Sequence, residues 1–371
     1  MDIPFFNYKK YCKDINYTQL IEEALETGYL IGGPFVEELE FRLEKFTGIK
    51  HCITVGNATD AMEIIFDFLK LPHGSNVLVP AHTMLATASA AHSSNLNPIP
   101  LDVDTKSLMI ELEQLKNTNL KNISACMVTQ LNGVVADMNP ISDFCKKEGI
   151  TLIEDSAQGL GAFNNNKHAG AWGIGGCLSF YPAKIAGCLG DGGALITNND
   201  ELALFARSVR DHGRGDELEA INWGRNSRLD SINARILIER IKDLDYILLR
   251  RRTLASIYNK KLKTLEGKSY IKLPPMYSTN SNSLSTYQNY EVQVKNKEYL
   301  IKYLKDNNIG TIKQWGGFSI AHFSKLGFDI NKYPKTKSLF EELLLLPINH
   351  LMVEEEIEFI CEKINYFYDH Y

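Results

Sequence analysis

The sequence lacks several features that would mark other classes of protein. No apolar run approaches the roughly 18 residues that a membrane-spanning helix needs. The N-terminal stretch MDIPFFNYKKYCKD has no apolar core like that of a secretory signal. The seven cysteines are odd in number and scattered, without a CxxC pair, so neither a disulfide framework nor a zinc site is indicated. These absences predict a cytoplasmic protein with reduced core thiols, no membrane association and no metal site.

The charge balance excludes nucleic-acid binding as an expected function. The net charge is -5 and the pI is near 6.0, so the chain shows no basic footprint for a phosphate backbone. With 371 residues, 44% of them hydrophobic, the chain can bury a sizeable core. This length predicts two domains, or one large domain with a smaller lobe.

Short apolar runs alternate with helical periods from about residue 50 to residue 200. Runs rich in Val, Ile and Leu that alternate with amphipathic helices predict an α/β fold with a mostly parallel sheet covered on both faces. The predicted strands are 51–57, 76–81, 97–103, 124–131, 151–157, 177–181 and 193–198, with helices at 59–70 and 137–149. Ligands of such sheets bind at the carboxyl ends of the strands, so functional residues are expected there.

The later part of the chain has a different composition. Residues 228–265 are predicted to form one long charged helix, and residues 273–288 are polar and rich in turn formers. The remaining sequence indicates a smaller α+β lobe closed by a helix. We therefore predict a large domain over residues 1–250, whose N-terminal segment can pack on the small domain, and a small C-terminal domain over residues 251–371.

Three groups of polar residues follow predicted strands, and each has two interpretations. Thr59 and Asp60 open a helix, which either binds a phosphate at its N-terminus or is simply capped there. Glu154 and Asp155 end an apolar strand, where a carboxylate needs a cationic ring nitrogen, a lysine or an arginine as partner. Lys184 precedes a glycine-rich stretch and is either a nucleophile beside a cofactor or an ordinary surface lysine.

Together the three groups match the needs of one cofactor. Pyridoxal phosphate (PLP) needs an anion cradle, a carboxylate that keeps its pyridine nitrogen protonated, and a lysine that binds its aldehyde. Ser179, five residues before Lys184, adds a hydroxyl for an anion. This combination is much less expected by chance than any single part of it. The residues therefore predict a PLP enzyme.

At these residues the sequence resembles the DegT/DnrJ/EryC1/StrS family of sugar aminotransferases, over nearly the whole chain. The matching motifs are GGPFVEELE (32–40), VGNATDAM (55–62), VPAHTMLAT (79–87), PIPLDVD (98–104), NGVVADM (132–138), IEDSAQGLGA (153–162), SFYPAK followed by LGDGGALITN (179–198), DHGRG (211–215) and GRNSRLDSINARI (224–236). The resemblance implies the aspartate-aminotransferase-like fold type I and a homodimer with composite active sites.

The resemblance also implies a role for each matching position. Lys184 would bind the cofactor covalently and move protons, and Asp155 would pair with the pyridine nitrogen. Gln158 would approach the cofactor's ring oxygen. The phosphate would be held by backbone N–H groups of Ala58 and Thr59, by the Ser179 hydroxyl and, from the neighbouring subunit, by Asn226.

The chain departs from the family pattern in three places where substrate is expected. Met84 stands where the family has an aromatic residue on the pyridine ring, and a thioether can also pack on a ring face. TQLNG (129–133) replaces VHLYG, and KQWGGFSIAHF (313–323) replaces a segment with Tyr and Pro. The predicted substrate-facing residues are His82, Gln130, Asn132, Trp315 and His322.

The family's chemistry implies transfer of an amino group from L-glutamate to a keto sugar, with the cofactor alternating between PLP and pyridoxamine phosphate. The favoured acceptor is a nucleotide-linked keto-deoxysugar used in cell-surface polysaccharide, lipopolysaccharide or other glycan biosynthesis.

One alternative acceptor is a sugar acid without a nucleotide, because TQLNG, YPAK, GCLGDGG and QWGG resemble Kdo 8-aminotransferases, which make 8-amino-3,8-dideoxyoctulosonate. An alternative of another class is a PLP-binding regulator without turnover. Relatives with histidine in place of this lysine are dehydratases, so Lys184 favours transamination.

Overall fold

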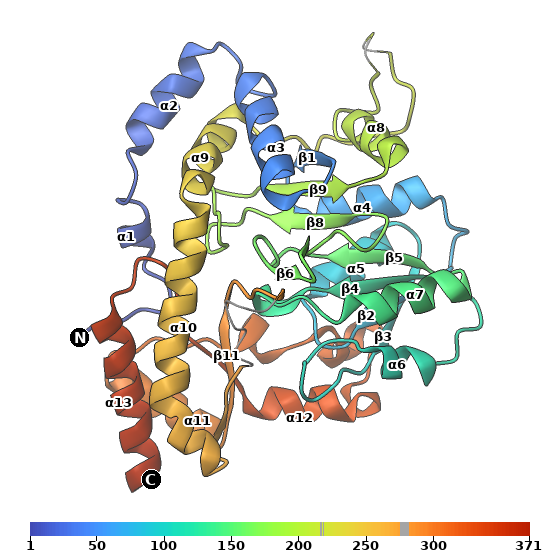
Figure 1. Cartoon of the computed structure of the whole chain (residues 1–371). Coiled ribbons are helices and arrows are strands. Elements are labelled where there is room, and N and C mark those ends of the chain that lie inside the picture. The colour runs from blue at the N-terminus through green and yellow to red at the C-terminus, as the bar shows by residue number, and fades with distance from the viewer. Residues whose placement is uncertain (216, 218, 275–281) are drawn as a thin grey trace.

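The computed structural model describes residues 1–371 except 216, 218 and 275–281. Its centre is a seven-stranded sheet in the order β1-β9-β8-β5-β4-β2-β3 (Figure 1). The strands are β1 (His51–Val55), β2 (Asn76–Pro80), β3 (Asn97–Leu101), β4 (Ile123–Thr129), β5 (Thr151–Asp155), β8 (Gly176–Ser179) and β9 (Gly193–Thr197). Strands β3, β2, β4, β5 and β8 pair in parallel, whereas β9 runs antiparallel to both of its neighbours. The predicted mostly parallel sheet is confirmed.

Helices cover both faces of this sheet, as alternate residues of one strand illustrate. Met127 of β4 packs with one face's helices, α4 (Ala58–Leu69), α5 (Leu85–Ser93) and α8 (Asp200–Val209). Its neighbour Cys126 points to the other face and packs with α6 (Leu112–Lys116) and α7 (Met138–Glu148). Under β1, β8 and β9 that second face is covered by α3 (Pro34–Thr47) and α9 (Ser231–Lys242). Because successive side chains of a strand point to opposite faces of the sheet, one strand contributes to two separate hydrophobic cores.

The C-terminal lobe has its own core and its own sheet. Strands β10 (Ile271–Lys272), β11 (Tyr290–Val294) and β12 (Leu343–Leu346) form an antiparallel sheet. Helices α10 (Leu244–Gly267) and α13 (Glu354–His370) lie side by side against it, and α11 (Lys297–Asp306) and α12 (Pro334–Glu342) complete the lobe (Figure 1). Ile3 joins this core and pairs with Ile309, so the N-terminal segment touches the lobe. The predicted boundary at residue 250 stays a prediction.

The long helix predicted over residues 228–265 is wrong in one respect, because the segment forms two helices. α9 ends and α10 begins at Asp243, whose φ of -107° and ψ of 27° leave the helical region. Aspartate competes with the helix for backbone hydrogen bonds and favours caps, which explains the break. The break lets α9 pack on the large domain while α10 continues into the lobe.

The remaining elements are short. They are helices α1 (Tyr8–Tyr11) and α2 (Tyr17–Glu26), the hairpin of β6 (Phe163–Asn164) and β7 (Lys167–His168), and the 3-10 turns Leu131–Gly133, Gln314–Gly317, Ile320–His322, Ser324–Leu326 and Ile330–Lys332. Six of the seven cysteines are buried free thiols, and Cys12 is exposed. Among the described residues, no helix has the length and apolar character to cross a membrane.

Candidate active site

The predicted cofactor residues come together at one edge of the large sheet, which we call the cofactor edge: residues 55–60, 155–158 and 179–184. Thr129, Asp155 and Ser179 end the parallel strands β4, β5 and β8, so these three ends point the same way. Antiparallel β9 starts at this edge, where Gly193 pairs with Val55 and with Ser179. The register alone therefore gathers residues that lie far apart in the sequence.

The start of α4 provides an anion site. The Asn57 side chain accepts a hydrogen bond from the Asp60 N–H at 2.9 Å, which leaves the N–H groups of Ala58 and Thr59 without a partner in the described chain. Gly193 lies directly against this turn, because a Cβ atom there would come within 2.6 Å of the Ala58 nitrogen. Both interpretations made from the sequence hold at once: the helix is capped, and its free N–H groups and dipole suit a phosphate.

Asp155 is a buried carboxylate without a cationic partner. Its Oδ2 accepts a hydrogen bond from the Thr87 hydroxyl at 2.6 Å, and its Oδ1 accepts one from the Ala157 N–H at 3.2 Å. None of its hydrogen-bond partners in the described chain is a lysine or an arginine. A carboxylate in this setting is suited to a cation supplied by a ligand, such as a protonated pyridine.

A chain of hydroxyl groups leads to Asp155 through the protein interior. Because Thr87 uses its hydrogen on Asp155, its oxygen must accept the bond that joins it to Thr83, 2.7 Å away. By the same reasoning Thr83 accepts from Thr129, 3.0 Å away. Every hydroxyl in this chain therefore donates its hydrogen in the direction of the Asp155 carboxylate.

Glu154, the neighbour of Asp155, has a different role, and both alternatives drawn from the sequence for it were wrong. Its Oε1 accepts from the N–H groups of Trp172 and Gly173, and its Oε2 accepts from the Gly170 N–H and from Gln130 Nε2. These four donors are neutral, so among the described residues no cation pairs with Glu154. Burial raises the pKa of Glu154, and the four hydrogen bonds oppose that rise. Glu154 anchors the loop around residues 170–173.

Lys184 follows β8 and turns back toward Asp155. Burial lowers the pKa of Lys184 to about 8, and the Asp155 carboxylate partly offsets this shift. The backbone on both sides of Lys184 is clamped by a single amide, because Gln288 Oε1 accepts from the Ile185 N–H at 2.9 Å and Gln288 Nε2 donates to the Ala183 carbonyl at 3.0 Å. Lys184 is thus a partly neutral amine on a fixed loop, as a nucleophile or base requires.

Gln158 is held beside Asp155 by the turn Leu131–Gly133. The Asn132 backbone N–H donates to Gln158 Oε1 at 2.7 Å. Since a backbone N–H can only donate, the oxygen of this amide faces Asn132 and its Nε2 is left as a donor for another group. In the described chain Nε2 has no hydrogen-bond partner, which fits the predicted approach to a ring oxygen of the cofactor.

Three other predicted residues, Met84, Asn226 and Ser179, are exposed or half-buried. Met84 is 48% exposed and its sulfur accepts from the Ala86 N–H at 3.0 Å, so its packing on a cofactor ring stays a prediction. Asn226 is exposed and its Oδ1 accepts from Arg228 Nε at 3.1 Å. Ser179 is half-buried at the end of β8, and its oxygen accepts from the Tyr181 N–H at 3.4 Å.

The predicted substrate residues are more enclosed than expected. Gln130 is fully buried between Glu154 and the Ala136 N–H, so this geometry gives it a structural role and does not support contact with substrate. His82 is also buried, with its ring edge-on to Trp315 at 5.5 Å between ring centroids, and burial lowers its pKa to about 4.

The 3-10 turns Gln314–Gly317 and Ile320–His322 carry the remaining candidates. Trp315 is half-buried with a φ of 48°, beside two glycines, and lies over His82 and Phe340. His322 is half-buried, accepts from the Ser319 N–H at 3.0 Å, and lies 5.1 Å from Phe340 between ring centroids. Both side chains retain an exposed part, so their contact with substrate stays a prediction.

Several contributors were not found from the sequence. The only local signal for Thr87 is its polar side chain in the first turn of α5, four residues after Thr83, which lies before the helix. Gln288 had no local signal, since it reaches the Lys184 loop from the small lobe across 103 residues. Tyr11 had none either, and its hydroxyl donates to the Gly187 carbonyl at 2.8 Å.

Comparison with known proteins agrees with this geometry. The model of the DegT/DnrJ/EryC1/StrS aminotransferase family matches residues 12–365. A UDP-2-acetamido-2-deoxy-3-oxo-D-glucuronate aminotransferase of Pseudomonas aeruginosa is 31% identical over 345 residues, 93% of this chain and 94% of that one. A dTDP-3-amino-3,6-dideoxy-alpha-D-galactopyranose transaminase of Aneurinibacillus thermoaerophilus is 31% identical over 367 residues, 98% of this chain and 99% of that one.

A solved structure extends the agreement to the fold. The crystal structure of a DegT DnrJ EryC1 StrS aminotransferase from Brucella abortus superposes with a TM-score of 0.91 at 29% identity, covering 99% of both chains. The predicted fold type I and the PLP dependence of the family are thereby confirmed. The chain belongs to the DegT/DnrJ/EryC1/StrS aminotransferase family, the PLP-dependent sugar aminotransferases.

Proposed function

We propose that this enzyme transfers the amino group of L-glutamate to the ketone of a nucleotide-linked deoxysugar. The observation that carries the proposal is Lys184, an amine with a pKa of about 8 that interacts with Asp155, a buried carboxylate without a hydrogen bond from a lysine or an arginine in the described chain. The two relatives named above support the acceptor class, because one is named for a UDP-linked keto sugar and the other for a dTDP-linked amino sugar.

The residues present fit the cofactor. The free N–H groups of Ala58 and Thr59 and the Ser179 hydroxyl would hold its phosphate, Asp155 its pyridine nitrogen, and Gln158 Nε2 its ring oxygen. When bound, PLP stabilises the negative charge that forms at the α-carbon of the amino donor. The buried position of Asp155 strengthens its attraction for a protonated nitrogen, because the local dielectric is low.

Lys184 would act as the base. Since its pKa is about 8, a fraction of its amine is neutral near pH 7 and can accept the proton that leaves the α-carbon of glutamate. The same amine would later deliver a proton to the sugar carbon that receives the amino group. The Gln288 clamp on Ala183 and Ile185 keeps this amine in place while the proton moves.

We also propose a cytoplasmic homodimer with shared sites. The loop before Asn226 exposes apolar side chains, with Trp223 99% exposed and Ile221 65% exposed, and a partner subunit would cover them. The free thiols agree with a reducing compartment. Mixing an inactive Lys184→Ala chain with an inactive Asn226→Trp chain should restore activity, because one hybrid site keeps both groups. Lack of recovery despite proven subunit exchange would disprove the shared site.

The function is tested with PLP-loaded protein. Borohydride should fix the cofactor to the peptide that contains Lys184, and L-glutamate alone should convert bound PLP to pyridoxamine phosphate. UDP- and dTDP-linked keto sugars should then consume the pyridoxamine form much faster than a nucleotide-free keto sugar acid. Faster turnover of the sugar acid would replace the proposed substrate by the alternative. Cofactor binding without amino transfer to any ketone would favour a regulator.

A further inference from the structure

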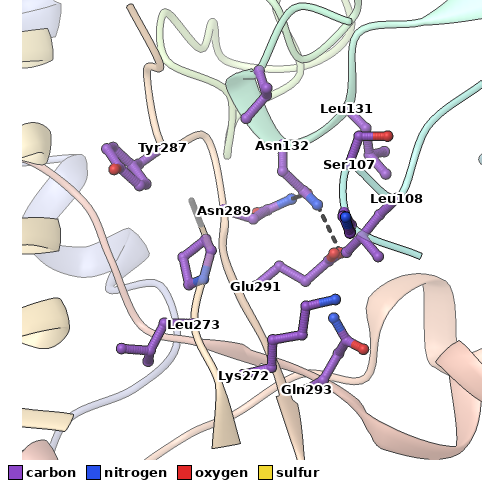
Figure 2. A pocket seen from close by; sticks show the side chains of 13 residues that line it. Ser107, Leu108, Leu131, Asn132, Lys272, Leu273, Tyr287, Asn289, Glu291 and Gln293 are labelled. Atoms are coloured by element: carbon purple, nitrogen blue, oxygen red, sulfur yellow. Dashed lines mark hydrogen bonds between the residues drawn. The ribbon is translucent and has the colours of Figure 1, made fainter. Parts of the chain in front are cut away.

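A buried carboxylate of the small lobe, Glu291 of β11, contacts the large domain. Glu291 is 6% exposed, and its Oε2 accepts a hydrogen bond from Asn132 Nδ2 at 2.7 Å (Figure 2). Both residues line a cavity of about 40 Å³ between the lobe and the large domain. The hydrogen bond between these two side chains therefore joins the lobe to the large domain at this cavity.

Asn132 is the only hydrogen-bond partner of the Glu291 carboxylate among the described residues. His82 Nε2 lies 3.9 Å from Glu291 Oε2, beyond hydrogen-bond distance, and burial keeps His82 neutral. Lys272 lines the same cavity, but its ammonium group donates to the Thr105 carbonyl. Burial raises the pKa of Glu291 to about 7, and the bond from Asn132 opposes that rise.

The small lobe determines how Asn132 is held. Its Oδ1 accepts from Asn289 Nδ2 at 2.7 Å and from Gln314 Nε2 at 3.4 Å, so every hydrogen bond of its side chain goes to the lobe. Its backbone has a φ of 55°, a conformation that asparagine adopts more readily than most residues. Two of the segments that depart from the family pattern, TQLNG and KQWGG, therefore meet at this side chain.

Asn132 also connects the small lobe to the cofactor edge, because its backbone contacts Gln158. Its backbone N–H donates to Gln158 Oε1 and thereby selects which end of that amide faces the site. Two hydrogen bonds therefore connect Glu291 to Gln158. The Asn132 side chain donates to the Glu291 carboxylate, and the Asn132 backbone N–H donates to Gln158 Oε1, which leaves Gln158 Nε2 facing the site.

We propose that Glu291 is a positioning residue that, through Asn132, fixes the Gln158 amide as a donor to the cofactor's ring oxygen. The seating of the small lobe on the large domain then controls how the cofactor ring is held. This inference rests on the proposed function, because it needs a PLP ring oxygen at Gln158. In this proposal Glu291 acts on the cofactor only through Asn132 and Gln158.

A double-mutant cycle tests the proposal with purified apo protein and PLP. The variants are Glu291→Met, Gln158→Ala and both together. The readouts are the dissociation constant for PLP and the pH midpoint of the visible band of the lysine-bound cofactor. Glu291→Met should weaken PLP binding about tenfold, the size of one hydrogen bond to a charged group, and should move the midpoint. In the Gln158→Ala background it should change neither value further. Independent, additive effects would overturn the proposal.

Two controls separate positioning from simple loss of stability. Glu291→Gln keeps an acceptor for Asn132 and should restore both readouts to near the wild-type values. Gln293→Met lies two residues along the same strand, lines the same cavity and makes no bond to Asn132, so it should leave both readouts unchanged. An equal shift in Gln293→Met would show a general effect of the strand and would also overturn the proposal.

A further variant covers the case in which Glu291→Met does not fold. Asn132→Gly keeps the left-handed backbone and the N–H but removes the tie to Glu291, and it should reproduce the change in PLP affinity. Borohydride labelling of Lys184 in the wild-type protein reports on the proposed function separately. If Lys184 is labelled and both Glu291→Met and Asn132→Gly bind PLP normally, only the positioning role of Glu291 fails.

Discussion

The cofactor edge and the junction between the lobes use their polar groups in different ways. At the cofactor edge several polar groups are left for a ligand. They are the N–H groups of Ala58 and Thr59, the amine of Lys184 and the negative charge of the Asp155 carboxylate. At the lobe junction, which we define as the turns Leu131–Gly133 and Gln314–Gly317 together with β11, the side chains of Asn132 and Glu291 are paired with protein groups. The cofactor edge is thus arranged to bind a ligand, and the lobe junction is arranged to hold the small lobe on the large domain.

This difference follows from how each region is built. The strand ends of a single sheet supply the cofactor edge, so the backbone fixes the positions and the side chains remain available. The lobe junction joins two separately packed cores, and buried polar groups there must satisfy one another because water is excluded. Variants at the edge should therefore alter chemistry, and variants at the junction should alter affinity or cofactor geometry.

The largest effect is expected for Lys184→Ala, which removes the base and the covalent attachment point. Its kcat should fall by about 10³-fold or more, measured as amino transfer from L-glutamate, with an unchanged fold by circular dichroism. Lys184→Arg is the matched control that keeps a cation but cannot act as a base, and it should be equally inactive. Substantial turnover in either variant would remove Lys184 from the mechanism.

Lys184 also predicts a pH dependence in the apo protein. Because burial disfavours the ammonium form, the amine becomes neutral above a pH of about 8 instead of near the ordinary lysine value of 10.5. The rate at which apo protein captures PLP should therefore rise with pH through a midpoint near 8. Stopped-flow measurement of the visible band gives this midpoint, and a midpoint near 10.5 would contradict the environment described here.

Adjacent carboxylates provide the next and sharpest comparison. Asp155→Asn should lower kcat by about 10²-fold while leaving the melting temperature nearly unchanged, because it loses the negative charge that a protonated pyridine needs. Glu154→Gln should do the reverse. Its amide nitrogen would face two of the four donors now bound to the carboxylate, which costs about 2–4 kcal/mol of unfolding free energy. Thermal denaturation and steady-state kinetics on both variants decide the assignment.

An intermediate effect is expected at the lobe junction for Trp315→Ala. If the exposed part of this ring stacks on the sugar, its removal should cost about 1–3 kcal/mol of sugar binding free energy. The KM for the sugar should then rise, while the KM for L-glutamate stays constant. Trp315→Phe should recover part of the loss. Equal changes in the two KM values would show that Trp315 only supports the packing of His82 and Phe340.

The smallest effect is expected for Thr87→Val, which removes one hydroxyl bond to Asp155 and keeps the side-chain shape. Its kcat should fall about tenfold, because Asp155 loses one of its hydrogen bonds. Thr87→Ser keeps the hydroxyl and should behave like the wild type. Identical kcat values for the Val and Ser variants would mean that the threonine chain does not influence the carboxylate.

Much of the fold and part of the site could be predicted because the relevant signals are local. Alternating apolar runs indicated the strands, and the polar residues that follow them indicated where Thr59, Asp155 and Lys184 would lie. Glu154 could not be assigned in this way, because its four donors come from residues 130 and 170–173, on other segments. Gln130 belongs to TQLNG, a motif that departs from the family pattern, and was therefore predicted to face the substrate. No neighbouring residue in the sequence indicated that its side chain would donate to Glu154.

By itself the sequence determined the order of elements, the cofactor and the identity of the groups at the strand ends, because periodicity, caps and motifs act over a few residues. Only the tertiary structure decided which polar groups are left for a ligand and which are paired inside the protein. Asn132 and Glu291 are 159 residues apart, and Gln288 clamps a loop 103 residues before it. Such partners are chosen by the packing of one domain on another, where a buried polar group must find whatever donor or acceptor the fold brings within reach.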